Sequence, residues 1–98
     1  MRTNSDEEYR MVKLLGSVSR AKILSLLLTH AGRPFYQREI MYETGLSLQP
    51  VQRELTNLTT LGIIKKQITD NRVYYQVNTT SPLFKPLQEI CNLFSEER

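Results

Sequence analysis

Side chains with paired hydrogen-bonding groups gather between residues 47 and 57. Arginine can donate two hydrogen bonds to O6 and N7 of guanine, and glutamine pairs in the same way with N6 and N7 of adenine. Residue types of this kind at this spacing can therefore read base edges in a DNA groove, or they can be ordinary solvated helix residues. The candidates for base contact are Ser47, Gln49, Gln52 and Arg53.

A second set of cations follows on two short runs of strand-forming residues. Residues 63–69 and 72–77 alternate apolar and polar side chains, and Asp70-Asn71 between them suits a tight hairpin turn. Cations on such a hairpin can hold phosphates of a duplex backbone, or they can serve only to block aggregation at a sheet edge. Together with residues on neighbouring helices, the candidates for backbone contact are Arg38, Thr56, Asn57, Lys65, Lys66, Arg72 and Tyr74.

A helix over residues 48–61 is expected to carry the first set on its surface. A turn and cap signal ends at Ser47, and Gly62 provides the stop. Apolar residues recur at steps of four, three and three, which places them on one helical face: Val51, Leu55, Leu58 and Leu61. The polar residues fall largely elsewhere on the helix.

The remaining elements are mostly helices. Pro34 forbids one continuous helix, and Tyr36 is a poor helix cap. The patterns predict helices over 6–15, 18–31 and 37–44, a minimal edge strand at 35–36, and a final helix preceded by a single turn at 82–84. The predicted order is two helices, the short strand, two helices, two strands and a helix. This mainly α arrangement with a small β-hairpin is a winged helix-turn-helix.

Composition bounds the class of protein. The chain of 98 residues fits a single domain, 1–98, which is large enough to bury a core without disulfide bonds or a structural metal. Thirteen Lys and Arg against ten Asp and Glu give a net charge of +3, which favours a polyanionic partner. The single cysteine excludes an intramolecular disulfide and fits a reducing cytosol. No apolar run reaches the roughly 18 residues of a membrane span, and residues 1–8 do not resemble a signal peptide. We expect a cytoplasmic protein.

No pattern in the sequence is typical of an enzyme or a metal site. A Gly-rich phosphate loop and a Gly-x-Ser-x-Gly motif are both absent. His30 is the single histidine and lacks the two or three further ligands that a metal needs. Cys91 is either a buried small hydrophobe or a redox-active thiol. We expect no catalytic residue, no metal and no cofactor.

Three stretches, taken in order, resemble the ArsR-type winged helix-turn-helix proteins of bacteria and archaea. The first reads LLGSVSRAKIL at residues 14–24, where a small residue, a cap and an arginine precede Ile-Leu. The second reads VQREL at 51–55 and continues through Leu58 to LGII at 61–64. The third, YYQVN at 74–78 with SPLF at 81–84, is similar to a subset found beside nucleotidyltransferase domains.

The resemblance implies a homodimer that binds a two-fold-related DNA operator and represses transcription. By position, residues 47–61 would be the recognition helix in the major groove and residues 65–72 the wing on the backbone. Residues 1–15 and 83–98 would form the dimer, through Met11, Leu14, Leu15, Leu87, Ile90, Cys91 and Phe94.

The resemblance does not imply metal sensing, because metal-sensing relatives carry ligands on the recognition helix or the last helix and residues 47–61 contain no Cys and no His. Two questions stay open, the effector and the class of function. Any small-molecule or redox effector is undetermined. The alternative function, from a different class, is a protein-interaction or adaptor module, for example a partner of a nucleotidyltransferase.

Overall fold

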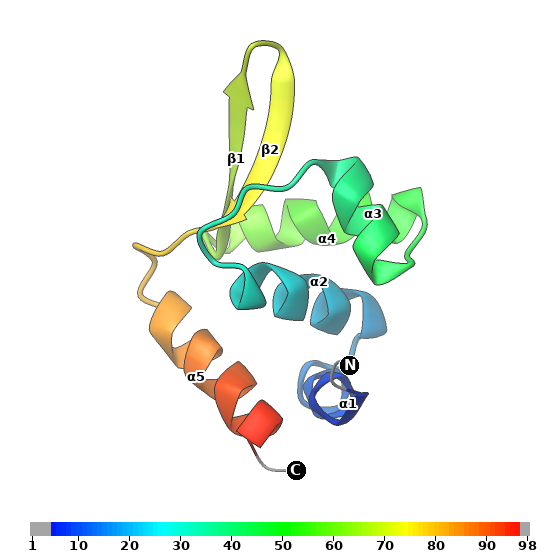
Figure 1. Ribbon diagram of the computed structural model, residues 1–98, viewed down its shortest axis with the longest axis vertical. Coiled ribbons are helices and arrows are strands. Elements are labelled where there is room, and N and C mark those ends of the chain that lie inside the picture. Colours follow the sequence, from blue (N-terminus) through cyan, green and yellow to red (C-terminus); the bar gives the residue numbers. More distant parts are fainter. Residues whose placement is uncertain (1–4, 97–98) are drawn as a thin grey trace.

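Glycines and prolines divide the chain into five helices and a β-hairpin (Figure 1). The computed structural model describes residues 5–96. Its elements are α1 (Ser5–Leu15), α2 (Val18–Thr29), α3 (Gln37–Thr44), α4 (Leu48–Thr60), β1 (Ile64–Thr69), β2 (Arg72–Val77) and α5 (Phe84–Glu96). The ends of the predicted domain 1–98, and of the predicted dimerisation segments 1–15 and 83–98, lie outside the described residues. None of the described helices is long and apolar enough to cross a lipid bilayer.

The turn between α3 and α4 is built by two residues that the sequence marks as turn and cap. Gly45 ends α3 in the left-handed conformation, at φ +73°, and its N–H donates to the Met41 carbonyl at 2.9 Å. This is a conformation that favours glycine. Ser47 occupies the N-cap position of α4 with extended backbone, but its side chain makes no capping hydrogen bond. The predicted helix start is therefore confirmed without the predicted capping bond.

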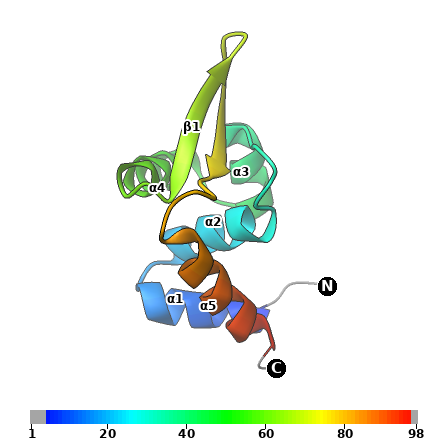
Figure 2. The same cartoon turned by 90° about the vertical axis from the view of Figure 1, so that its left-hand side faces the viewer.

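The hairpin turns where the sequence predicts. β1 and β2 are antiparallel, and the pairing runs from Ile64 with Val77 at the base to Thr69 with Arg72 at the tip. Asp70 and Asn71 close the turn with φ of 51° and 63°, the left-handed values that a two-residue hairpin turn requires. Figure 2 shows the hairpin standing away from the helices. Its base is buried, whereas most of its length is exposed to solvent.

The predicted strand at 35–36 is not formed, so the sheet has two strands and not three. Phe35 makes only a single bridge to Tyr75, in which each backbone N–H donates to the other's carbonyl at 2.8 Å. Pro34 has no N–H to donate, and Tyr36 already serves as the N-cap of α3. Only one residue is thus left to pair with the edge of β2.

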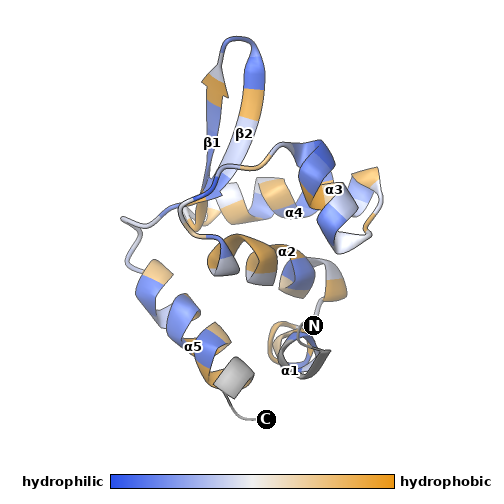
Figure 3. Cartoon of the chain, in the orientation of Figure 1, coloured by the Kyte–Doolittle hydropathy of each residue, from blue (hydrophilic) through white to orange (hydrophobic). Residues whose placement is uncertain are grey.

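The core surrounds α2, which packs against α1, α3, α4 and α5. In Figure 3 the most continuous hydrophobic stretch lies on this helix. α2 ends at Thr29, two residues before the predicted end, because His30 leaves the helical conformation. The buried apolar residues are Met11, Ala21, Ile23, Leu24, Leu27, Leu28, Phe35, Ile40, Val51, Leu55, Leu58, Ile63, Ile64, Val77 and Cys91. This core fixes one face of α4 and the base of the hairpin, and thereby the position of the residues discussed next.

Candidate nucleic-acid interface

One side of α4 is exposed along its whole length, opposite the side that the core buries. Val51, Leu55 and Leu58 are buried, as their spacing predicts, whereas Leu61 of the same predicted face is 56% exposed because it lies beyond the end of α4. We define the outer face of α4 as its exposed residues from the cap onwards: Ser47, Leu48, Gln49, Gln52, Arg53, Thr56 and Thr60. All four predicted base-contact residues lie on it, and the Arg53 side chain is 62% exposed. Asn57, a predicted backbone contact, is partly buried at the edge of this face.

Glu54, the one acidic residue of α4, does not lie on the outer face. Glu54 is buried, with its side chain 4% exposed, and forms an ion pair with Arg20 of α2. Arg20 Nε donates to one carboxylate oxygen at 2.8 Å and Nη2 to the other at 3.4 Å. The pKa of Arg20 is raised, first by this hydrogen bond and then by the carboxylate charge. The arginine thus ties α2 to α4, and no described carboxylate of α4 faces solvent to repel a phosphate.

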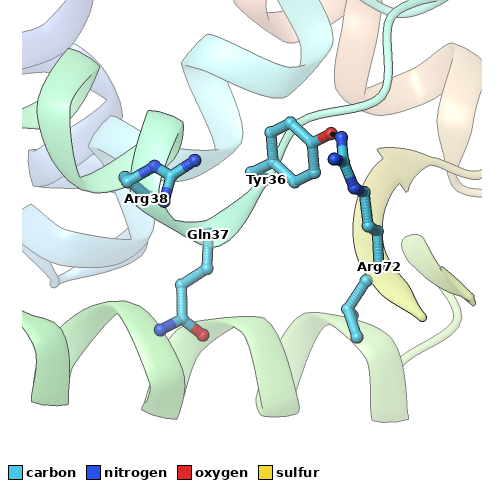
Figure 4. Close-up of a pocket in the computed structure, with 5 residues that line it drawn as sticks. Tyr36, Gln37, Arg38 and Arg72 are labelled. Carbon is cyan, nitrogen blue, oxygen red and sulfur yellow. Dashed lines mark hydrogen bonds between the residues drawn. The ribbon is translucent and has the colours of Figure 1, made fainter. Parts of the chain in front are cut away.

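The start of α3 and the start of β2 enclose a shallow pocket of about 400 Å³, lined in part by two arginines and Tyr36 (Figure 4). Arg38 extends from the first turn of α3, and Arg72 extends from the hairpin with its guanidinium at the Tyr36 hydroxyl. Gln37 and Val73 complete the lining. Two predicted backbone contacts, Arg38 and Arg72, are thus brought to one pocket.

Two tyrosines join the hairpin to the helical body at this pocket. The rings of Tyr36 and Tyr74 stack with centroids 4.6 Å apart and planes inclined by 29°. Their hydroxyl oxygens lie 3.0 Å apart, and Arg72 Nη1 donates to the Tyr36 hydroxyl at 2.9 Å. We call these three residues the tyrosine clasp. Together with the Phe35–Tyr75 bridge, the clasp fixes the angle between the hairpin and α3.

The clasp shifts the pKa values of the two phenols in opposite directions. The pKa of Tyr36 is lowered, first because its hydroxyl is hydrogen-bonded to Tyr74 and then because Arg72 donates to it. The pKa of Tyr74 is raised, first by the same hydrogen bond to Tyr36. For Tyr36, a folded pKa below that of an unfolded tyrosine, about 10, stabilises the fold above the unfolded value. That stabilisation is lost as the pH falls through the folded pKa.

Replacing Arg72 with glutamine should therefore move the titration of Tyr36 to higher pH, because the cation that favours the phenolate is gone. The measurement is the NMR shift of the Tyr36 ring as a function of pH, with the Tyr36 signal assigned from its absence in a Tyr36→Phe protein. Lys85→Gln removes an exposed charge from α5 and should leave the curve unchanged. An identical curve for the Arg72→Gln protein would show that the clasp does not form in solution.

The hairpin register separates the two lysines that the sequence analysis treated alike. Neighbouring residues of a strand point to opposite faces, and paired residues share a face. Lys65 pairs with Gln76 and so lies on the face of Tyr74 and Arg72. Lys66 pairs with Tyr75, on the face whose base is buried against the helices. Lys65 therefore adds its charge to the clasp side of the hairpin, and Lys66 points away from it.

No protein-family model and no curated protein sequence matches this chain. Solved structures do match over nearly its whole length. The transcriptional repressor BigR from Xylella fastidiosa superposes with a TM-score of 0.68 at 18% identity, over 96% of this chain and 90% of that one. HlyU from Vibrio cholerae N16961 superposes with a TM-score of 0.64 at 20% identity, over 95% of this chain and 96% of that one.

A third match settles the architecture. The homodimeric winged helix-turn-helix DNA-binding domain of Mb0332 from Mycobacterium bovis, a possible ArsR-family transcriptional regulator, superposes with a TM-score of 0.63 at 23% identity. The alignment covers 99% of this chain and 92% of that fragment. The chain has the winged helix-turn-helix fold. In that fold α3 and α4 are the helix-turn-helix pair and the hairpin is the wing.

The residues predicted for a dimer fall into three groups in this winged helix. Met11 and Cys91 lie in the core of the single chain, 0% and 4% exposed, which corrects their placement on an interface surface. α1 and α5 pack against each other and cover them. Leu14 is 55% exposed, whereas the other four only border the core as partly buried side chains: Leu15, Leu87, Ile90 and Phe94.

Three residues of the winged helix escaped the sequence analysis as site residues: Tyr36, Gln37 and Leu48. Tyr36 is a poor cap by residue type, yet its N–H donates to Glu39 Oε1 at 2.9 Å, half of a capping box. A glutamate three residues after a helix start is a signal that could have been used. The stacking of Tyr36 on Tyr74 could not have been predicted, because 38 residues separate them. Among the described residues, no group of His, Cys, Asp and Glu could hold a metal ion.

Proposed function

We propose that this chain is an ArsR-type, sequence-specific DNA-binding regulator of transcription that acts as a homodimer. The observation that carries the proposal is the outer face of α4, which presents amide, guanidinium and hydroxyl groups while its one acid is buried in an ion pair. We propose repression as the output, on the fold resemblance to the repressor BigR.

The outer face of α4 fits the major groove, which admits a helix and displays a distinct donor and acceptor pattern for each base pair. Arg53 is the candidate for guanine, because its exposed guanidinium can donate to O6 and N7 together. Gln49 and Gln52 are the candidates for adenine, and Ser47 for either a base or a phosphate. Thr56, one turn further along, is placed for the sugar-phosphate backbone, with Asn57 at its edge.

The pocket between α3 and the wing fits a backbone phosphate beside that groove. Arg38 and Arg72 supply two charges, the Tyr36 hydroxyl lies against Arg72, and Lys65 shares the same face of the wing. Arginine donors in this arrangement suit the tetrahedral oxygens of phosphate. The tyrosine clasp then fixes the angle of the wing relative to α3. At this angle the base-contact residues of α4 and the phosphate-contact residues of the wing would bind one stretch of duplex.

The dimer is proposed to form through α1 and α5, at the end of the molecule opposite the wing tip (Figures 1 and 2). Besides Leu14, α1 exposes Tyr9 and α5 exposes Leu93. Two copies related by a two-fold axis would place their α4 helices on successive major grooves. The half-sites should then lie roughly 10 base pairs apart, or a multiple of that spacing.

Duplex affinity measured over a range of salt concentrations tests this function. Each phosphate contact releases counterions, so the logarithm of affinity should fall linearly with the logarithm of salt at about 0.9 per contact. Arg72→Gln should weaken binding to all duplexes alike and flatten the slope by about 0.9. Lys85→Gln, which loses the same charge from α5, should keep the slope of the unmodified protein. An adaptor module would show no duplex binding and hence no slope, which would refute the proposal.

A further inference from the structure

Leu48 is an apolar side chain that the fold leaves exposed on an otherwise polar surface. It is the first residue of α4 and 46% exposed, and it does not belong to the residues packed on the core. The other apolar residues of this helix, from Val51 to Leu58, are buried. A single exposed leucine is common on protein surfaces. What distinguishes Leu48 is its position, because it lies among the residues proposed to contact bases.

The position of Leu48 relates it to the base-reading candidates. Residues four apart on a helix lie above one another on the same side, so Leu48 adjoins Gln52, and it is flanked in sequence by Ser47 and Gln49. The first residues of a recognition helix are those that approach base edges most closely. α2 lies between α4 and the pair α1 and α5 (Figures 1 and 2), so the proposed dimer surface does not cover Leu48.

We infer that Leu48 reads the 5-methyl group of a thymine in the major groove, an inference that rests on the proposed function. The thymine methyl is the one apolar group that base pairs display there. Against any other base the leucine would desolvate nitrogen or oxygen atoms without giving them a hydrogen bond, which is unfavourable. Because Gln52 on the same side suits adenine, the two side chains together favour A·T pairs at neighbouring positions of the half-site.

A methyl scan of the bound duplex tests the inference. Each thymine of a duplex enriched from a random pool is replaced in turn by deoxyuridine, which lacks only the methyl group. The unmodified protein should lose about fourfold in affinity at one thymine of each half-site, the effect of one buried methyl group. Leu48→Ala should bind the thymine duplex more weakly and lose its sensitivity at that position alone. Leu61→Ala, at an exposed leucine just beyond the end of α4, should retain the sensitivity of the unmodified protein.

Two outcomes would overturn the inference while duplex binding itself stands. One is a scan in which no thymine responds. The other is a Leu48→Ala protein that remains as sensitive as the unmodified protein at every thymine. Absence of duplex binding by the unmodified protein would instead refute the proposed function together with the inference, so the two failures are distinguishable.

Discussion

Replacing Arg20 with methionine is expected to lower the free energy of unfolding by about 3 kcal/mol, because it leaves a buried carboxylate without its partner. Glu54 is 4% exposed, and both of its oxygens lie within hydrogen-bonding distance of Arg20. Arg53 cannot replace that paired contact, because its Nε is 4.0 Å from the carboxylate on a side chain that is 62% exposed. Urea denaturation at one fixed protein concentration measures the loss, since association would otherwise alter the apparent stability.

Two further proteins show whether the loss comes from the unpaired charge. Arg20→Met combined with Glu54→Leu removes both charges and fills the space with apolar groups, so it should recover most of the lost stability. Lys22→Met removes a neighbouring cation of α2 whose partner, Glu8, is 41% exposed, and should cost less than about 1 kcal/mol. If the double variant were less stable than either single one, the ion pair would not be what holds α4 against α2.

Replacing Arg53 with alanine is expected to relax base preference at one position of each half-site by about 1–3 kcal/mol. The guanidinium can donate two hydrogen bonds to a guanine, and an alanine can donate none. The measurement is affinity for a panel of duplexes that carry each of the four base pairs at every position in turn. Arg72→Gln serves as the contrast, because loss of a phosphate contact should weaken every member of the panel equally.

Arg53→Lys separates charge from hydrogen-bond geometry in the same experiment. Lysine keeps the positive charge, so the salt dependence should remain, but it lacks the planar pair of donors and should lose part of the discrimination. A panel that is identical for the arginine, lysine and alanine proteins would show that Arg53 is a solvated surface residue. The outer face of α4 would then have to read DNA through its glutamines and Leu48, or not at all.

Most element boundaries could be predicted because their causes are local. Gly45 and Gly62 stand where the chain takes left-handed φ values, and Asp70-Asn71 forms the hairpin turn that its residue types favour. The buried side of α4 follows from the spacing of Val51, Leu55 and Leu58. In each case the residues concerned lie within one or two turns of each other, so the pattern contains the information.

The parts that could not be predicted depend on contacts between distant residues. The ion pair of Arg20 with Glu54 spans 34 positions, and the stacking of Tyr36 on Tyr74 spans 38. The sequence pattern also predicts that Met11 and Cys91 are buried, but it does not show whether the same chain or a second copy buries them. The packing of α1 against α5 decides for the same chain.

Selection from a pool of random duplexes tests the central claim most directly. The protein should enrich a two-fold-related sequence whose half-sites lie roughly 10 base pairs apart or at a multiple of that spacing. The same selection with the Arg53→Ala protein should lose the preference for one base pair in each half-site. A pool that stays random after repeated rounds with the unmodified protein would contradict the account, because the outer face of α4 would then read no sequence.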